Sequence, residues 1–301
     1  MRFFLSLIAL FSILITQAQV NVQIQPDGKR YSKILLNGAV SAKYDLVFIG
    51  DGFTASDQQL FNTKVNEAVN ALRSSEPYAS KICSFNIWKV NVISKESGIS
   101  NPNSGITRNT ELGCRFGDRK KNEVERCIFT NFSNKCYEAA GYAPAYDAVF
   151  ILVNDQQWGG CEGGLVFSTI ATGFAGIVTH ELGHKIANLG DEYQCLNCDP
   201  GEPAATYHGT EPVQVNLTIQ NNRSKIKWSQ FILQATPVPT KKDRPFGVVG
   251  LFEGGFYASK GIFRPQFHCL MENVNSDFCT VCKTEMIIRL NNYCSTSTIR
   301  P

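Results

Sequence analysis

Residues 180–184 read H-E-L-G-H, which is the pattern H-E-x-x-H. On a helix, side chains four residues apart lie on one face, so His180 and His184 can present two imidazole nitrogens to one metal ion. Imidazole ligands suit zinc, which lowers the pKa of a bound water to about 7. Glu181 lies beside them and can take the proton as that water attacks a carbonyl, then pass it to the leaving amine. The motif predicts one catalytic Zn²⁺ held by His180 and His184, with Glu181 as general base.

The surroundings of the motif favour a buried helix, because apolar residues precede it at 177–178 and follow it at 186, 187 and 189. The chain has only four histidines, His180, His184, His208 and His268. At that frequency the pattern arises by accident in roughly a few chains per thousand. The competing interpretation, two hydrogen-bonded histidines on an ordinary helix, is therefore the weaker one.

A catalytic zinc also needs a third protein ligand and an open coordination position. The chain just after the second histidine supplies candidates, since Asn188 and Gly190 tolerate left-handed backbone conformations and can turn the chain back. Asp191 is the first candidate and Glu192 the second, while His208 would need a remote loop to fold back. The alternative for both carboxylates is a solvated acidic turn, or a pair that orients the histidines through hydrogen bonds.

This arrangement resembles the metzincin plan, in which a glycine turn delivers a third ligand six residues after the second histidine. Here the spacing is one residue longer and the ligand is a carboxylate. Metzincins also carry a methionine turn beneath the zinc. Met271 lies in a turn-like stretch, residues 269–273, although taken alone it is better explained as a core methionine.

The elements that must position these residues alternate between strands and helices. Apolar runs predict buried strands and amphipathic stretches predict helices, an alternation typical of an α/β layer arrangement. The strands are expected at 44–49, 85–93, 148–153 and 165–171. The first helix is expected after Ser56 as N-cap, with Gln59 three residues on, and further helices within 118–140, at 174–189 and from near 279 to 291. Beyond residue 191 loops are expected, with one short helical candidate near 225–234.

Residues 1–18 have the pattern of a signal peptide, with Arg2 before an apolar run and small residues at the end, Thr16 and Ala18. The run is short for a membrane span, which disfavours an uncleaved anchor. We expect cleavage after Ala18 and a secreted or periplasmic protein with no membrane span after cleavage. The expected organisation is a leader segment at 19–43 and one catalytic domain at 44–301, with an N-terminal lobe at 44–193 and a C-terminal lobe at 194–301.

The composition excludes several classes. A hydrophobic fraction of 43% with 18% charged residues excludes intrinsic disorder. The net charge is only +3 and no concentrated basic stripe is present, so no nucleic-acid partner is expected. The oligomeric state stays open.

The chain holds eleven cysteines, and in an oxidising compartment these are expected to form disulfides. Most would tie the loop-rich C-terminal lobe, each stabilising the fold by about 2–4 kcal/mol. The pairs Cys195-x-x-Cys198 and Cys279-x-x-Cys282 formally offer a zinc set, but the gap between them is far longer than the usual ~15–20 residues. A structural zinc is therefore disfavoured. The odd count leaves one thiol unpaired, and we expect it to be Cys161, which has no local partner.

Taken together, these residues resemble the bacterial IgA peptidase family of zinc metalloendopeptidases, over about residues 44–290. Three blocks carry the resemblance: residues 46–54 with 85–88 and 96–98; residues 180–184 through 189–193; and residues 253–257, 260–265, 269–271 and 278–282. The H-E-x-x-H pattern is shared by many families, whereas the D-E-Y ending at 191–193 and the third block are specific. One departure is Asn188, where the family usually has glycine.

The resemblance implies an α+β zincin-like fold with a mixed sheet, and proteolysis of a protein or peptide substrate. By position it implies His180, His184 and Asp191 as metal ligands, Glu181 as base and Met271 in the methionine turn. Specificity for IgA does not carry over, because a family name is not a substrate.

Other side chains near these blocks are candidates for the same site. Tyr257, in the loop before Met271, can donate to a developing oxyanion, and Tyr193 can do the same or brace the third ligand. For both tyrosines packing is the stronger interpretation. Lys260 and Arg264 can bind a substrate carboxylate, and a buried or surface structural role explains them at least as well.

Two other functions remain open beside the secreted zinc endopeptidase. One is a catalytically silent binding protein that keeps the fold, which is disfavoured because the ligands and the base are all present. The other is a metal-dependent amidase that acts on cell-wall peptides by the same chemistry.

Overall fold

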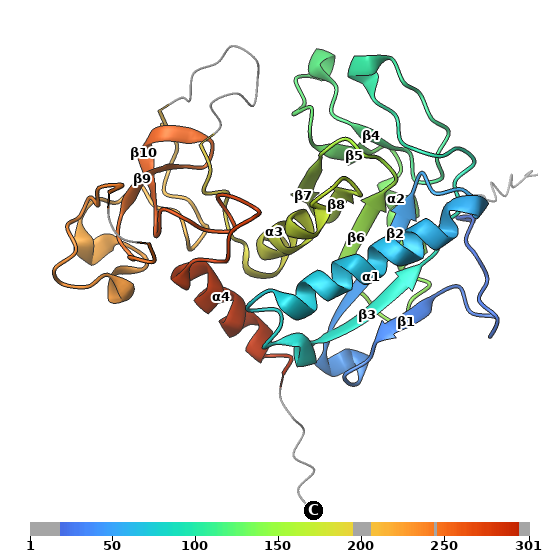
Figure 1. Cartoon of the computed structure of the whole chain (residues 1–301), viewed down its shortest axis with the longest axis horizontal. Coiled ribbons are helices and arrows are strands. Elements are labelled where there is room, and N and C mark those ends of the chain that lie inside the picture. The colour runs from blue at the N-terminus through green and yellow to red at the C-terminus, as the bar shows by residue number, and fades with distance from the viewer. Residues whose placement is uncertain (1–18, 195–205, 244–245, 295–301) are drawn as a thin grey trace, which may run out of the picture.

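The computed structural model describes residues 19–194, 206–243 and 246–294, and its centre is a six-stranded sheet (Figure 1). The strand order is β1-β3-β2-β6-β8-β7. Strands β3, β2, β6 and β8 run parallel, and both edge strands, β1 and β7, run antiparallel to their neighbours. The bounds are β1 Ser32–Leu35, β2 Tyr44–Asp51, β3 Phe85–Val90, β6 Ala148–Val153, β7 Gly160–Gly163 and β8 Leu165–Thr169. The prediction of an α/β fold with a mixed sheet is confirmed.

The central strands are apolar along their length because both faces of the sheet are covered. Alternate side chains of a strand point to opposite faces. Leu46 and Phe48 of β2 belong to a core with helices α1 (Gln58–Ser74) and α3 (Phe174–Ala187). Val47 and Ile49 belong to a second core with α2 (Ser133–Ala140). The expected strands at 44–49 and 148–153 are confirmed for this reason: a strand buried on both faces reads as a continuous apolar run.

The start of α1 differs from the expectation. The chain enters it through a 3-10 turn at Ala55–Asp57, and the Asp57 carboxylate accepts from the Thr54 N–H at 3.0 Å and the Thr54 hydroxyl at 2.7 Å. This capping box belongs to the 3-10 turn, whereas Asp57 is the N-cap residue of α1 and makes no side-chain cap hydrogen bond to it, so the expected N-cap at Ser56 with Gln59 three residues on is wrong. A short carboxylate such as that of Asp57 can satisfy a free backbone N–H at the start of such a turn.

The helix expected within 118–140 is also mostly wrong, because only its last part is helical, as α2. Before it lie a 3-10 turn at Arg119–Lys121 and strand β5 (Ile128–Thr130), which pairs with β4 (Cys114–Phe116). The charged residues pair locally across this hairpin, with Arg115 contacting Glu123 at 2.5 Å. These ion pairs across the hairpin take the place of the pairs along a helix that the charged stretch had indicated.

Beyond residue 206 the chain is mostly loops, as expected. It also contains a β-hairpin that the sequence did not predict. Strands β9 (Phe252–Gly255) and β10 (Ala258–Arg264) pair antiparallel in the part of the chain to one side of the sheet (Figure 1). The helical candidate near 225–234 consists of two 3-10 turns, Arg223–Lys225 and Ser229–Phe231. Helix α4 (Thr280–Asn291) begins and ends where expected and packs against α3.

The disulfides are not distributed as expected. Cys83 bonds Cys294, and Cys127 bonds Cys161, so the expectation that Cys161 is unpaired is wrong. Its partner is distant in sequence, and only the folded hairpin brings it near. Among the residues that the structure describes, the free thiols are Cys114, Cys136, Cys269, Cys279 and Cys282, all buried. The interpretation of the last three as disulfide staples of the C-terminal lobe is therefore wrong.

Two expectations fall outside the described residues, namely the signal peptide at 1–18 and the pair Cys195 and Cys198. Among the helices the structure describes, none is long and apolar enough to cross a bilayer.

Candidate metal centre

The H-E-L-G-H segment lies in the second half of α3, and this helix is buried on most sides. The helix ends at Asn188, which adopts a left-handed conformation with φ 49° and donates its N–H to the His184 carbonyl at 2.8 Å. This is the turn expected of an asparagine at this position. It redirects the chain so that residues 189–193 pass back over the histidines.

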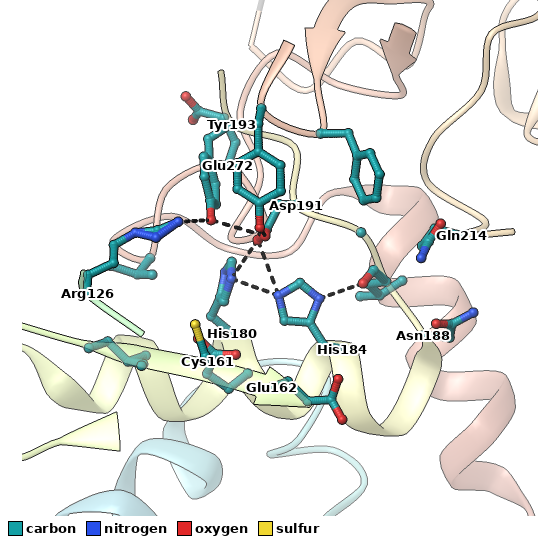
Figure 2. Close-up of a pocket in the computed structure, with 18 of the residues that line it drawn as sticks. Arg126, Cys161, Glu162, His180, His184, Asn188, Asp191, Tyr193, Gln214 and Glu272 are labelled. Atoms are coloured by element: carbon teal, nitrogen blue, oxygen red, sulfur yellow. Dashed lines mark hydrogen bonds and ion pairs between the residues drawn. The ribbon is translucent and has the colours of Figure 1, made fainter. Parts of the chain in front are cut away.

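Three side chains converge above α3: His180, His184 and Asp191 (Figure 2). The Oδ1 atom of Asp191 lies 3.0 Å from Nε2 of His180 and 3.2 Å from Nε2 of His184. The two Nε2 atoms lie 3.1 Å apart. A tetrahedral zinc with ligand bonds of about 2.1 Å separates its ligand atoms by about 3.4 Å. The triangle therefore has nearly the size that one zinc ion requires.

The hydrogen bonds on the far side of each ring fix which of its nitrogens carries the proton when the ring is neutral. Nδ1 of His180 lies 3.1 Å from the Leu270 carbonyl, and Nδ1 of His184 lies 2.6 Å from the Leu189 carbonyl. Because a carbonyl only accepts, each Nδ1 carries a proton, so each ring in its neutral form turns the Nε2 lone pair toward Asp191. Asp191 Oδ1 is buried without a hydrogen-bond partner. Three lone pairs that face one another fit a cation.

The charges in the cluster are strongly coupled. Burial opposes ionisation of Asp191, but the two imidazoles outweigh it and hold its pKa well below the ordinary value. Burial likewise opposes the charged form of His184, yet the hydrogen bond and charge of Asp191 raise its pKa to about 9. A proton and a metal ion therefore compete for the same atoms.

Glu181 lies beside the cluster on the same helix and lines the same pocket. Glu181 is only 6% exposed, and this burial raises the pKa of its carboxyl group above the ordinary value. The carboxylate lies close to edge strand β7, since a Cβ added at Gly160 would come within 3.2 Å of Glu181 Oε1. A raised pKa suits a general base, which must accept and return a proton near neutral pH.

The outer oxygen of Asp191 is held by two tyrosines. Tyr193 donates to Oδ2 at 3.1 Å, and Tyr257 also donates to Oδ2. Arg126 in turn donates to the Tyr193 hydroxyl at 2.5 Å. Burial and the neighbouring Asp191 charge raise the pKa of both phenols, so both remain donors. The aspartate is thereby oriented with Oδ1 toward the histidines.

Tyr257 reaches this position through a strained turn. The loop between β9 and β10 consists of Phe256 and Tyr257, with φ of 49° and 67°. Such left-handed conformations cost non-glycine residues about 1–3 kcal/mol each and persist where the surroundings enforce them. Here the Phe256 N–H donates to the Asp191 carbonyl at 2.8 Å and the Tyr257 N–H to the Tyr193 carbonyl at 3.1 Å. The turn is therefore bound directly to the segment that carries Asp191.

Met271 lies beneath α3, where Gly183 makes room for it. A Cβ added at Gly183 would come within 3.1 Å of the Met271 sulfur. The same turn supplies the Leu270 carbonyl that receives His180 Nδ1. The Met271 carbonyl accepts from the Glu192 N–H at 2.7 Å. The turn around Met271 thus contacts both the histidine helix and the chain that follows it.

Several candidates from the sequence lie elsewhere. Glu192 is fully buried with three cysteines rather than with the histidines. His208 and Lys260 are exposed and do not line the pocket. Arg264 is buried and donates to the carbonyls of Glu192 and Gly254, at 3.0 and 2.8 Å, which is a structural role.

Other pocket residues carry no sequence signal. Arg126, Trp158, Gly160, Glu162 and Gln214 line the cavity, which holds about 310 Å³. Arg126 stands in a charged stretch that looked helical, and it reaches the pocket because the neighbouring Cys127 is bonded to Cys161 of β7. Its role depends on that long-range pairing.

The fold and the cluster together define an α/β protein in which a helix-borne histidine pair and an aspartate can hold a metal at an open pocket. The chain matches the family described as IgA Peptidase M64 over residues 33–247 and 241–290. The matches cover most of its length, and the chain belongs to this family, as the resemblance predicted. A comparison with curated proteins finds no match. Membership of a peptidase family assigns the chain to the hydrolases that act on protein or peptide substrates.

Proposed function

We propose that the chain is an exported zinc-dependent endopeptidase with His180, His184 and Asp191 as metal ligands and Glu181 as general base. The observation that carries the proposal is the convergence of three lone pairs on one point beside a buried glutamate. Metal chemistry with a neighbouring base is a standard means of hydrolysing an amide.

Zinc at this site would supply an acidified water and polarise the scissile carbonyl. The residues of the chain do the rest. Glu181 takes the proton from the attacking water and delivers it to the leaving amine. Tyr257, 42% exposed, is the proposed donor to the oxygen that gains charge as the carbonyl is attacked, and its one O–H would turn from Asp191 Oδ2 to that oxygen. Tyr193 and Arg126 keep Asp191 oriented.

An extended peptide is the substrate geometry that the pocket favours. Edge strand β7 contributes Gly160, Cys161 and Glu162 to the lining, and it is the last strand of the sheet. A peptide can pair with such an edge through main-chain hydrogen bonds, which recognise a chain segment rather than a terminus. This supports cleavage within a chain.

Export is supported by chemistry as well as by the leader pattern of residues 1–18. Within the described part of the chain two disulfides form, Cys83–Cys294 and Cys127–Cys161. Disulfides persist in secreted and periplasmic proteins and are rare in the cytosol.

The test is hydrolysis of a denatured protein such as casein, before and after treatment with a zinc chelator. We expect chelation to abolish cleavage and added zinc to restore it, with internal fragments among the products. Cleavage that a chelator leaves untouched would refute the metal-dependent mechanism, and release of single terminal residues would refute the endopeptidase assignment.

A further inference from the structure

A second cluster of metal-ligating side chains lies close to the first. It consists of Glu192, Cys269, Cys279 and Cys282, whose ligand atoms all lie within 4.8 Å of one another. All four residues are buried: Cys279 is 4% exposed and the other three are 0% exposed. The four come from three segments: the chain after α3, the turn around Met271 and the N-terminus of α4. Only the folded chain assembles them.

Two of the three sulfur atoms accept hydrogen bonds from backbone N–H groups. Cys269 Sγ accepts from the N–H groups of Met271 and Cys279, at 3.5 and 3.3 Å. Cys279 is the N-cap of α4, and its Sγ accepts from the Cys282 N–H at 3.5 Å. Donors and a helix N-terminus aimed at sulfur stabilise thiolates over thiols. Thiolates are the form in which cysteine binds metals.

The carboxylate of Glu192 lacks the partners that its burial demands. Oε1 accepts from Asn216 Nδ2 at 2.9 Å and lies 3.2 Å from Cys282 Sγ. Oε2 is buried with no hydrogen-bond partner. A buried carboxylate is costly unless it is paired or coordinates a metal. Its placement among three sulfurs points to the second solution.

A disulfide explains the cluster less well. Joining two of the three sulfurs would leave one buried thiol and would not satisfy Glu192 Oε2. The structure closes two disulfides elsewhere but leaves these three sulfurs unbonded. A tetrahedral zinc with Zn–S bonds of about 2.3 Å separates its sulfurs by about 3.8 Å, which is compatible with the observed spread.

We propose that Glu192, Cys269, Cys279 and Cys282 bind a second, structural zinc ion. Four protein ligands close the coordination sphere and leave no open position, which distinguishes a structural from a catalytic site. Each thiol gives up its proton as the metal binds. The guanidinium of Arg264, against the Glu192 carbonyl at 3.0 Å, and the N-terminus of α4 offset the resulting negative charge.

The site would hold the elements behind the candidate metal centre. Glu192 directly follows Asp191, and its N–H donates to the Met271 carbonyl at 2.7 Å. Cys269 is two residues before Met271. A zinc bound to Glu192, to Cys269 and to α4 would hold these segments together. It would thereby fix the position of the Asp191 carboxylate relative to the turn around Met271, which lies under α3. This inference does not rest on proteolytic activity.

The experiment is to measure zinc per chain in the full-length protein, purified without chelator or reductant. We expect two zinc ions in the unaltered protein, one in His184→Ala and one in Cys282→Ala. The matched control is Cys114→Ala, which also removes a buried free thiol but lies in β4, and it should keep both.

A second measurement covers the case in which Cys282→Ala does not fold. Cobalt loaded into the His184→Ala protein should give a sulfur-to-cobalt charge-transfer band, because the three thiolates remain. Peptide mapping after alkylation in denaturant should find Cys269, Cys279 and Cys282 as free thiols. A zinc content that Cys282→Ala leaves unchanged, no charge-transfer band in the cobalt-loaded protein, or a disulfide among these three cysteines would each overturn the proposal, whereas a single zinc that Cys282→Ala removes would count only against the histidine site.

Discussion

Asp191 and Glu192 are neighbours in the chain, yet their carboxylates reach two different clusters. Asp191 Oδ1 lies 3.0 Å from His180 Nε2, whereas Glu192 Oε1 lies 3.2 Å from Cys282 Sγ. The hydrogen bond from the Glu192 N–H to the Met271 carbonyl, 2.7 Å long, holds the chain at the point between them. The D-E pair is therefore a link between a candidate catalytic centre and a candidate structural one, and each carboxylate should respond differently to substitution.

Replacement of Glu181 by glutamine should abolish most activity without removing zinc. The amide keeps the shape but cannot accept the proton, and loss of a general base lowers kcat by about 10²–10⁴-fold. The measurement is kcat on a peptide substrate together with zinc content. Glu67→Gln, a glutamate on α1 paired with Lys64, is the control and should leave both unchanged. Full activity in Glu181→Gln would show that another group is the base.

Replacement of Asp191 by alanine should release the metal held by the histidines. Two imidazoles alone form an incomplete site, because three protein ligands are needed to hold a catalytic zinc. Zinc content should fall by one ion per chain and activity should be lost. The control is Asp243→Ala, an exposed aspartate remote from the pocket lining. An Asp191→Ala protein that retains its full zinc content would exclude this residue as a ligand.

Substitutions of the two tyrosines that donate to Asp191 should affect different quantities, kcat for Tyr257 and zinc affinity for Tyr193. If Tyr257 donates to the oxyanion, Tyr257→Phe should lower kcat by about 10²–10³-fold with zinc retained. Tyr193→Phe should instead weaken zinc binding by about 10-fold or more, because it orients a ligand. Competition with a chelator measures the second effect and steady-state kinetics the first. Equal effects of both variants on zinc affinity alone would argue that Tyr257 only positions the aspartate.

The disulfide Cys127–Cys161 should matter to the pocket as well as to stability. It ties edge strand β7 to the segment that carries Arg126. Its removal by a double serine substitution should lower the free energy of unfolding by about 2–4 kcal/mol and raise KM. The matched control is removal of Cys83–Cys294, which closes no part of the pocket lining. It should reduce stability while KM stays constant, so a similar KM in both variants would contradict the role of β7 in binding.

Met271 should tolerate a change of side chain but not its loss. The residue is fully buried under α3, so Met271→Ala leaves a cavity and should cost about 2–5 kcal/mol. Met271→Leu conserves volume and should cost less than about 1.5 kcal/mol. Urea unfolding of both proteins measures the difference. Equal stability of the two variants would mean that the floor of the site does not depend on this packing.

The features that were predictable from sequence are those set by local patterns. Strands β2 and β6 follow directly from apolar runs, because a doubly covered strand has no polar face. The turn at Asn188 also follows from residue type, since asparagine tolerates the left-handed conformation. Errors arose where distant contacts decide the structure. The segment before α2 forms a hairpin because β5 pairs with β4 and because Cys127 forms a disulfide with Cys161 of β7.

The sequence by itself determined the spacing of His180, Glu181 and His184, because helix periodicity places them without reference to the rest of the chain. Only the tertiary structure decided which carboxylate faces them, since the local pattern ranks Asp191 before Glu192 but leaves both as candidates. The choice depends on the β9–β10 turn and on the turn around Met271, both far along the chain. The same packing gathers three cysteines around Glu192, and only the pair Cys279-x-x-Cys282 among these four has a spacing typical of metal sites. A ligand set drawn from separate segments exists only where long-range packing holds those segments together.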